Sequence, residues 1–318
     1  MKTITLEEAA KLLLENDNYT VLMHKSPDGD AVGSAYGLCT ALRSIGKKAN
    51  PLCGDEIPSC YSYITDKLEY EEFEEKFIIS VDLASTALLS GKAKEYEEKV
   101  DLCIDHHFSN TGYAREGYVD GGASSCAEII KKLLDIMKAD ISKDTANALF
   151  TGICTDTGCF KYSSVSPETH RIAAELMEKG ADSTAICKLM FDTKSKEKLE
   201  LEKMVLETLE YFEDGKIALI QITEDIMQKS GACPGDTESI ASIPCQISGV
   251  KIGITMKEKE NGEYRFSVRT TGDNDACAIC KTFGGGGHRS AAGCSIFKEH
   301  DAAKADMLAA CKTALGDK

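Results

Sequence analysis

The chain has 318 residues, of which 42% are hydrophobic and 28% are charged, and a formal net charge of −15. This length and composition predict a globular protein with two buried cores and exclude a disordered chain. The acidic balance argues against long duplex nucleic acid or an anionic membrane as a partner, because a basic surface normally binds either one. The positive charge needed to bind a small anion must therefore be local, supplied by metal ions or a few arginines.

The N-terminus and the cysteines bear on the cellular location. The first eight residues turn acidic at once and lack the apolar core of a signal peptide, and the longest apolar runs have the length of strands. We therefore expect a cytoplasmic protein whose 14 cysteines are free thiols. Cys277 and Cys280 form a lone Cys-x-x-Cys pair without a second pair or a histidine at zinc-finger spacing. We expect them to lie on one helical turn.

In the N-terminal part, from about residue 19 to residue 180, strand patterns alternate with helix patterns. This alternation favours a doubly wound, mostly parallel sheet with helices on both faces. Thr20–His24 is predicted to be a strand, and a helix is predicted over about residues 31–45, with Asp30 as its N-terminal cap and Gly46 at its end. Further predicted elements are strands at Phe77–Leu83 and Val100–Ile104 and a helix at Asp144–Cys154.

The composition changes after about residue 183. Residues 183–212 are rich in Lys, Glu, Leu and Met without Pro or Gly, which predicts an amphipathic helix that joins two domains. We expect a first domain over residues 1–185, a connecting helix over 186–212 and a smaller α/β domain over 213–318. The strands predicted in the smaller domain are Lys216–Ile222, Lys251–Met256 and Tyr264–Arg269.

Acidic and imidazole side chains follow several predicted strands. The residues concerned come from four segments that are distant in the chain: His24 with Asp28 and Asp30, then Asp82, then Asp105 with His106 and His107, and finally Asp156 in a predicted turn. Ligands bind at the carboxyl ends of the strands in a doubly wound sheet, so these side chains are expected to meet at one edge. Any one segment alone could be an ordinary turn or a helix cap. Together they predict a metal site.

The residue types also indicate which metal is bound. Several carboxylates and imidazoles in one place repel or crowd each other unless cations lie between them. A mixed imidazole and carboxylate set without thiolate suits Mn²⁺ or Mg²⁺. Six ligands fit two ions that share one carboxylate, and such a pair of ions can activate water for displacement at phosphorus.

These motifs resemble those of DHH-family phosphoesterases. Residues 24–34, Val81 with Asp82, residues 105–107 and residues 154–158 are similar to the four motifs of the family, in the family's order. A run of four glycines followed by His288 resembles the signature of the DHHA1 domain, which follows in one subfamily. Ser26 departs from the pattern, since many relatives carry Asn at this position.

The resemblance implies a role for each of these residues. His24 and Asp28 would hold one manganese ion, while Asp30, His106 and Asp156 would hold the other. Asp82 would bridge the two ions. Asp105 would orient a neighbouring ligand, and His107 would face the substrate phosphate as a hydrogen-bond donor or general acid; Mg²⁺ or Co²⁺ could replace Mn²⁺.

The C-terminal domain is expected to hold the substrate. Successive glycines let a backbone approach a ligand closely and direct N–H groups at an anion; a flexible linker is the alternative. An arginine at the position of Arg269 grips a substrate phosphate in the subfamily, and Arg265 lies on the same face of the predicted strand. The expected substrate-binding residues are Arg269, Gly285, Gly286, Gly287, His288 and Arg289.

Within the family, the length of the chain favours the group of manganese-dependent oligoribonucleases that also remove the 3′-phosphate from 3′-phosphoadenosine 5′-phosphate. The expected partners are therefore short oligonucleotides or small nucleotides, with no long duplex and no membrane, and relatives often form homodimers. A stand-alone phosphodiesterase for cyclic or linear dinucleotides is the first alternative. A nucleotide-binding protein without catalysis is the second, although every motif carboxylate and imidazole is present.

Overall fold

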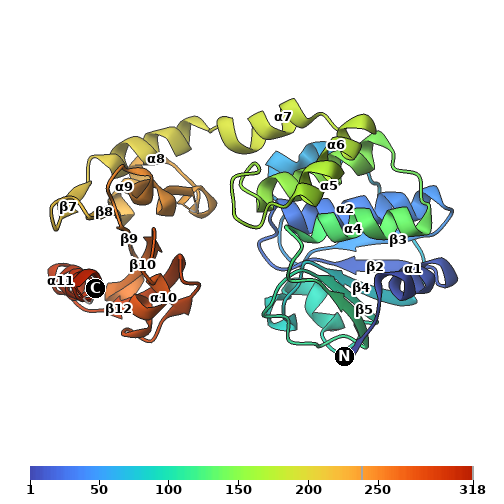
Figure 1. Ribbon diagram of the computed structural model, residues 1–318, viewed down its shortest axis with the longest axis horizontal. Helices are drawn as coiled ribbons and strands as arrows, with labels where there is room; N and C mark the ends of the chain where they lie inside the picture. Colours follow the sequence, from blue (N-terminus) through green and yellow to red (C-terminus); the bar gives the residue numbers. More distant parts are fainter. Residues whose placement is uncertain (238, 317–318) are drawn as a thin grey trace. The chain divides into compact units, whose positions relative to one another are not determined.

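The computed structural model describes residues 1–237 and 239–316. Residue contacts divide the chain into two compact units, residues 1–193 and 194–318. The first unit runs from blue to yellow-green in Figure 1 and the second from yellow to red. Each unit contains a sheet of six strands. The predicted two-domain α/β class is confirmed, whereas the domain limits expected at residues 185 and 212 remain a prediction.

The first sheet is parallel at every described pairing, in the order β1-β6-β5-β4-β2-β3. The chain adds β3 on one side of β2 and then β4 on the other, so the strand order reverses between β2 and β4. This reversal is where doubly wound sheets bind ligands. The strands are β1 (Lys2–Thr3), β2 (Tyr19–Leu22), β3 (Ala49–Leu52), β4 (Phe77–Val81), β5 (Leu102–Asp105) and β6 (Glu116–Val119).

Both faces of this sheet are buried, but they are covered differently. In β4, Ile79 packs into the core shared with the helices, while its neighbour Ile78 packs against the opposite layer. That opposite layer contains 3₁₀ helices, which replace the α-helices expected there. The α-helices of this unit are α1 (Leu6–Glu15), α2 (Gly29–Ser44), α3 (Ser62–Thr65), α4 (Cys126–Met137), α5 (Lys143–Asp156), α6 (Pro167–Glu178) and α7 (Ser183–Cys187), and the 3₁₀ helices are η1 (Ser59–Tyr61), η2 (Thr86–Leu88) and η3 (Gly91–Tyr96).

Residues 186–212 do not form the single connecting helix predicted from their composition. α7 continues as a π-helical turn, Lys188–Asp192, and a separate helix, α8 (Lys196–Leu206), begins after Ser195. The Ser195 hydroxyl accepts a hydrogen bond from the backbone N–H of Lys198, which is the arrangement that starts a new helix. The composition of the segment contained no Pro or Gly to mark this interruption.

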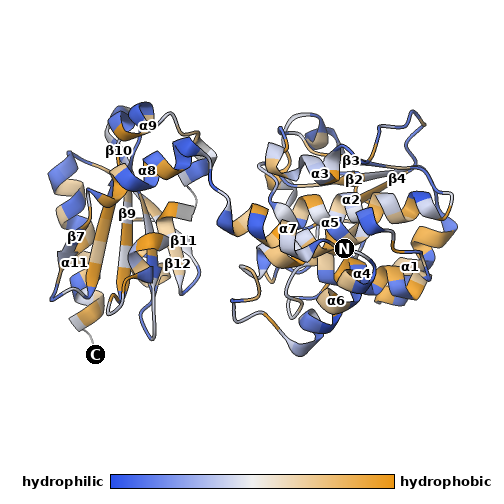
Figure 2. Cartoon of the chain, turned by 90° about the horizontal axis from the view of Figure 1, so that it is seen from above, coloured by the Kyte–Doolittle hydropathy of each residue, from blue (hydrophilic) through white to orange (hydrophobic). Residues whose placement is uncertain are grey.

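The second sheet is mixed, in the order β11-β12-β10-β9-β8-β7, and only β8 and β9 run parallel among its described pairs. Its three predicted strands are confirmed to within two residues. Hydrophobic residues (orange in Figure 2) are frequent along its strands, with helices on both faces. The elements are β7 (Glu210–Phe212), β8 (Ile217–Ile222), α9 (Glu224–Ser230), η5 (Pro234–Thr237), η6 (Ser239–Gln246), β9 (Ile252–Glu258), η7 (Glu260–Gly262), β10 (Glu263–Thr270), α10 (Ala276–Lys281), β11 (Gly286–Gly287), β12 (Ala291–Phe297) and α11 (His300–Gly316).

Two remaining features are the Cys-x-x-Cys pair and the length and apolar character of the helices. Cys277 and Cys280 lie on the single helix α10, as expected, with Cys280 buried. Among the described helices, none combines the length and the apolar character needed to cross a bilayer.

Close contact between α2 and α5 brings two of the acidic segments together. A Cβ atom added to Gly33 in α2 would lie 2.3 Å from the carbonyl oxygen of Ala148 and 2.9 Å from the backbone nitrogen of Gly152, both in α5. Backbone atoms cannot give way as a flexible side chain can. Glycine at position 33 therefore sets the distance between the two helices.

We predict that Gly33→Ala destabilises the first unit by about 1–3 kcal/mol, because the helices must move apart to admit the methyl group. Urea unfolding followed by circular dichroism measures this. Gly316→Ala is the control, since an added Cβ there meets no atom within 4 Å. Equal stability of Gly33→Ala and the wild type would contradict this account of the helix contact.

Candidate metal centre

Three neighbouring strands of the first sheet deliver polar side chains to one edge. His24 lies just after β2, Asp82 follows β4 directly, and Asp105 is the last residue of β5. Parallel strands end at the same edge, so the three segments meet although they are far apart in the sequence. The structure thus brings together the residues that the sequence pattern had singled out.

Asp82 lies at the centre of this group. Only 2% of the residue is exposed, and its backbone adopts a left-handed conformation with φ of 51°, which is costly for a residue other than glycine. Its Oδ2 lies 3.7 Å from Nε2 of His24, and its Oδ1 lies 3.4 Å from Nε2 of His106. Oδ1 is buried and has no hydrogen-bond partner. A buried carboxylate oxygen of this kind needs a cation.

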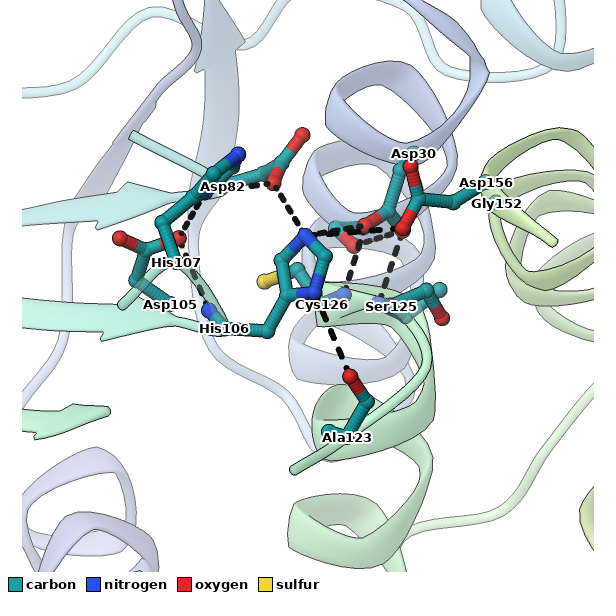
Figure 3. Close-up of polar contacts among 12 residues, drawn as sticks. Asp30, Asp82, Asp105, His106, His107, Ala123, Ser125, Cys126, Gly152 and Asp156 are labelled. Carbon is teal, nitrogen blue, oxygen red and sulfur yellow. Dashed lines mark hydrogen bonds and ion pairs between the residues drawn. The ribbon is translucent and has the colours of Figure 1, made fainter. Parts of the chain in front are cut away.

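Three overlapping groups of three possible ligands share this edge, and Asp82 belongs to two of them. In each group one ligand atom per residue lies within 4.8 Å of the others. In the second group, Nε2 of His106 is 3.6 Å from Oδ2 of Asp156 and 3.9 Å from Oδ2 of Asp30 (Figure 3). The first group is His24, Asp28 and Asp82, the second is Asp30, His106 and Asp156, and the third, which overlaps both, is Asp82, His106 and His107.

The start of α2 positions two of these carboxylates, and it corrects one prediction. Asp28, not Asp30, is the N-cap: its Oδ1 accepts hydrogen bonds from the backbone N–H groups of Asp30 and Ala31, both at 3.0 Å. Asp30 lies in the first turn and is 1% exposed. Its carboxylate accepts hydrogen bonds from the backbone N–H groups of Cys126 and Ala127, at 2.6 and 2.9 Å, at the start of α4. The helix therefore begins two residues earlier than predicted, and α4 fixes the Asp30 carboxylate.

Asp156 also differs from its predicted setting. It is the last residue of α5 and not part of a turn. The helix extends two residues beyond its predicted end at Cys154. The close packing of α2 against α5 then places Asp156 in the same group as Asp30.

Asp105 anchors the two histidines without belonging to any of these groups. It is fully buried, and its Oδ1 accepts hydrogen bonds from Nδ1 of His107 at 2.7 Å and from the backbone N–H of His106 at 2.8 Å. Its Oδ2 accepts from the amide of Asn110 at 2.7 Å, a residue that the sequence pattern did not identify. With Nδ1 held by Asp105, the Nε2 atom of His107 is the nitrogen left to contact another group (Figure 3).

The protonation of these residues reflects an excess of negative charge. Burial opposes the charged form of His24, but the neighbouring carboxylates outweigh it and raise the pKa of His24 to about 11. Burial also opposes the charged form of His106, but the nearby carboxylates, Asp82 above all, outweigh it and raise the pKa of His106 to about 10. Burial raises the pKa of Asp156 to about 6 and that of Asp30 well above its usual value.

These shifts describe a site that attracts positive charge. Protonated imidazoles neutralise part of the negative charge of the carboxylates, and a bound divalent cation would neutralise it more directly. The donors are carboxylate oxygens and imidazole nitrogens, which suit Mn²⁺ or Mg²⁺. The orphaned Oδ1 of Asp82, close to both groups, fits a carboxylate shared between two ions.

In the second unit, Arg265, Ser267 and Arg269 lie on one face of β10, as strand alternation predicts. They line a cavity of about 520 Å³ together with Lys257 and Lys259, and none of the described residues in its lining is acidic. The cavity is thus a local concentration of positive charge in an acidic chain. The sequence pattern did not identify the two lysines.

The glycine run has a structural role that the sequence reading did not anticipate. A Cβ atom on Gly285 would lie 2.2 Å from the carbonyl oxygen of Gly293 in β12, and one on Gly287 would lie 2.6 Å from that of Ala291. These glycines let β11 approach β12 closely. Only Gly286 of the three expected binding glycines faces open space.

His288 and Arg289 lie in the tight turn between β11 and β12. Arg289 is exposed and donates a hydrogen bond to the carbonyl oxygen of Asp273, and neither residue lines the cavity that contains Arg269. The turn nevertheless lies near the end of β10, since Arg269 is paired with Ala291 across the sheet.

Comparison with known families follows the same division of the chain. The model of the DHH family, N-terminal domain, matches residues 18–153, and the model of the DHHA1 domain matches residues 214–316. The chain contains both domains. The resemblance predicted from the five motifs is thereby confirmed.

Individual relatives agree with this result. The chain is 29% identical over 282 residues to the bifunctional oligoribonuclease and PAP phosphatase NrnA of Thermus thermophilus, covering 87% of this chain and 83% of that protein. It is 24% identical over 300 residues to the cyclic-di-AMP phosphodiesterase GdpP of Bacillus subtilis, but covers only 45% of that protein. A solved structure of an exopolyphosphatase-related protein from Bacteroides fragilis matches with a TM-score of 0.85 and 27% identity, covering 97% of this chain and 95% of that one.

We predict that Asp82→Asn lowers the affinity for Mn²⁺ at least a hundredfold, because the amide removes the negative charge that both ligand groups share. Isothermal titration calorimetry measures the binding. Asp144→Asn is the control, since Asp144 is an exposed carboxylate in the first turn of α5. Unchanged Mn²⁺ affinity in Asp82→Asn would contradict a metal centre built around this residue.

Proposed function

We propose that the chain hydrolyses phosphoester bonds in short oligoribonucleotides and in 3′-phosphoadenosine 5′-phosphate, with divalent cations held by six residues, Asp82 among them. The observation that carries this proposal is the meeting of two ligand groups at one buried carboxylate. The chain is a hydrolase of phosphoester bonds, in keeping with its DHH and DHHA1 domains. The NrnA relative is named for the same two substrates.

The donor set supports two Mn²⁺ ions, one held by His24, Asp28 and Asp82 and the other by Asp30, His106 and Asp156. Carboxylates suit both Mn²⁺ and Mg²⁺, and the imidazole ligands favour Mn²⁺ over Mg²⁺. When bound, such a pair of cations supplies an activated water and neutralises the charge that develops on the phosphate.

The protein's own contribution begins with His107. Asp105 holds Nδ1 of this imidazole and raises its pKa through that hydrogen bond, so the ring tends to keep both protons. The Nε2–H group is then available to donate to a phosphate oxygen or to protonate the leaving ribose oxygen. Asp105 acts through His107 and is therefore a positioning residue.

The positive cavity of the second unit supports a small anionic substrate. Arg269 can grip a phosphate with two parallel hydrogen bonds, while Arg265 and the two lysines add attraction over a short range. Elsewhere the chain is strongly acidic, which would repel a long phosphate backbone. This distribution of charge favours a substrate of a few nucleotides.

The similarity to GdpP supports a second candidate function, that of a phosphodiesterase for cyclic or linear dinucleotides. The same residues around Asp82 would serve that chemistry. The two candidates differ in the group that the second unit binds, so substrate preference separates them.

We predict that the purified chain with Mn²⁺ releases phosphate from 3′-phosphoadenosine 5′-phosphate and mononucleotides from a 5′-labelled RNA dimer and pentamer. The assay panel also contains cyclic di-AMP, the linear dinucleotide pApA and pyrophosphate. Turnover confined to cyclic di-AMP and pApA would support the second candidate instead. No turnover of any substrate, with Mn²⁺ bound, would overturn the proposal that the chain is an enzyme.

We further predict that Arg269→Ala raises KM at least tenfold while kcat falls far less, because the arginine binds the substrate away from the reacting bond. Steady-state kinetics on 3′-phosphoadenosine 5′-phosphate measures both constants. Arg171→Ala is the control, since Arg171 is an exposed arginine on α6 that pairs with Glu168. An unchanged KM in Arg269→Ala would remove this residue from the substrate site.

A further inference from the structure

Three cysteines gather outside the carboxylate site, where three separate segments meet. Cys154 is on the last turns of α5, Cys159 is in the turn that follows, and Cys187 is the last residue of α7. The Sγ atoms of Cys154 and Cys187 are 3.5 Å apart, and all three sulfur atoms lie within 4.8 Å of one another.

The spacing of the sulfur atoms fits a common metal ion. Thiolates about 2.3 Å from a tetrahedral zinc ion are about 3.8 Å apart. The 3.5 Å between the sulfur atoms of Cys154 and Cys187 is close to this value, and no pair among the three is more than 4.8 Å apart. A disulfide requires sulfur atoms about 2.05 Å apart, so the cysteines are not joined. Cys159 and Cys187 are partly exposed, which gives an ion access, whereas Cys154 is buried.

The backbone around the cluster holds these sulfur atoms together at a cost. Gly158, Cys159 and Phe160 are consecutive residues in the left-handed conformation, with φ of 57°, 59° and 61°. Such a run is unfavourable for the two residues that are not glycine. The backbone N–H of Cys159 donates to the carbonyl oxygen of Cys154 at 2.8 Å, which folds the turn back onto α5. On the other side, Cys187 leads directly into the π-helical turn, a feature that is often found at functional sites.

A reactive thiol is a poorer explanation of the cluster than a metal site. Reactive cysteines have lowered pKa values and cationic neighbours. Here burial raises the pKa of Cys187, and the neighbouring Cys159 and the carboxylate of Asp192 add to this, which outweighs the lowering by the hydrogen bond with Cys154. The surroundings thus disfavour a free thiolate, whereas a bound cation would stabilise the deprotonated sulfur atoms.

We propose that Cys154, Cys159 and Cys187 form a binding site for a thiophilic metal ion, with Zn²⁺ as the expected ion and a fourth position open to water. Three sulfur ligands select a different class of ion from the carboxylate and imidazole ligands around Asp82. Binding would tie the end of α5 to the end of α7. The proposal does not depend on the hydrolytic function.

Titration with Cd²⁺ tests the site, because cadmium–thiolate bonds absorb in the ultraviolet while cadmium–carboxylate bonds do not. The full chain is used, reduced and without added thiols. We expect one Cd²⁺ per chain with a thiolate band, which Zn²⁺ displaces. In Cys159→Ser and in Cys187→Ser the affinity should fall at least tenfold and the band should weaken by about one third or more.

Cys277→Ser is the matched control, since Cys277 is also half-buried but belongs to the Cys-x-x-Cys pair in α10. The band should be unchanged in this variant and in Asp82→Asn. A band that persists at full strength in both Cys159→Ser and Cys187→Ser, or that disappears in Cys277→Ser, would overturn the proposal. Circular dichroism checks that each variant is folded; if Cys187→Ser is not, the partly exposed Cys159 decides the test alone.

Discussion

The first unit depends on the burial of negative charge at the edge of a parallel sheet. The Asp82 carboxylate is enclosed, its Oδ1 has no hydrogen-bond partner, and its backbone is held in a left-handed conformation. Burying a carboxylate oxygen without a hydrogen bond is costly, so such an arrangement persists only where a nearby positive charge compensates it. The imidazoles of His24 and His106 take up protons readily for the same reason.

The rest of the unit serves to hold the other carboxylates beside Asp82. The N-terminus of α4 donates two backbone hydrogen bonds to Asp30, and the close contact between α2 and α5 brings Asp156 to the same place. Asp105 is not itself a candidate ligand, and its carboxylate accepts hydrogen bonds from His107 and from the backbone N–H of His106. Each of these side chains thus lies on a regular element or directly after one.

Much of this could be predicted from the sequence, because strand ends and the residues that follow them are encoded locally. The strands before His24, Asp82 and Asp105 were predicted to within two residues, and their shared edge follows from parallel pairing. Helix ends were less accurate: the cap was assigned to Asp30 in place of Asp28, since an aspartate at either position could cap a helix that begins just after it. Contacts that arise only in three dimensions were missed, namely the amide of Asn110 on Asp105 and the lysines beside Arg269.

The glycine run shows how one pattern can satisfy two requirements. Gly285 and Gly287 are needed for the approach of β11 to β12, so their presence by itself does not require a bound phosphate. The cysteine cluster has no pattern in the sequence, because the spacings between residues 154, 159 and 187 match no metal motif and only the fold brings the three residues together. Carboxylate, guanidinium and thiol groups are therefore gathered in three different places, each suited to a different kind of ligand.

The central claim is that Asp82 is shared between two cations. Electron paramagnetic resonance of the chain loaded with Mn²⁺ tests it most directly, because two manganese ions bridged by one carboxylate are magnetically coupled. We predict two Mn²⁺ per chain and a coupled spectrum. A spectrum of isolated Mn²⁺ ions at full occupancy, or saturation at one ion per chain, would contradict the account.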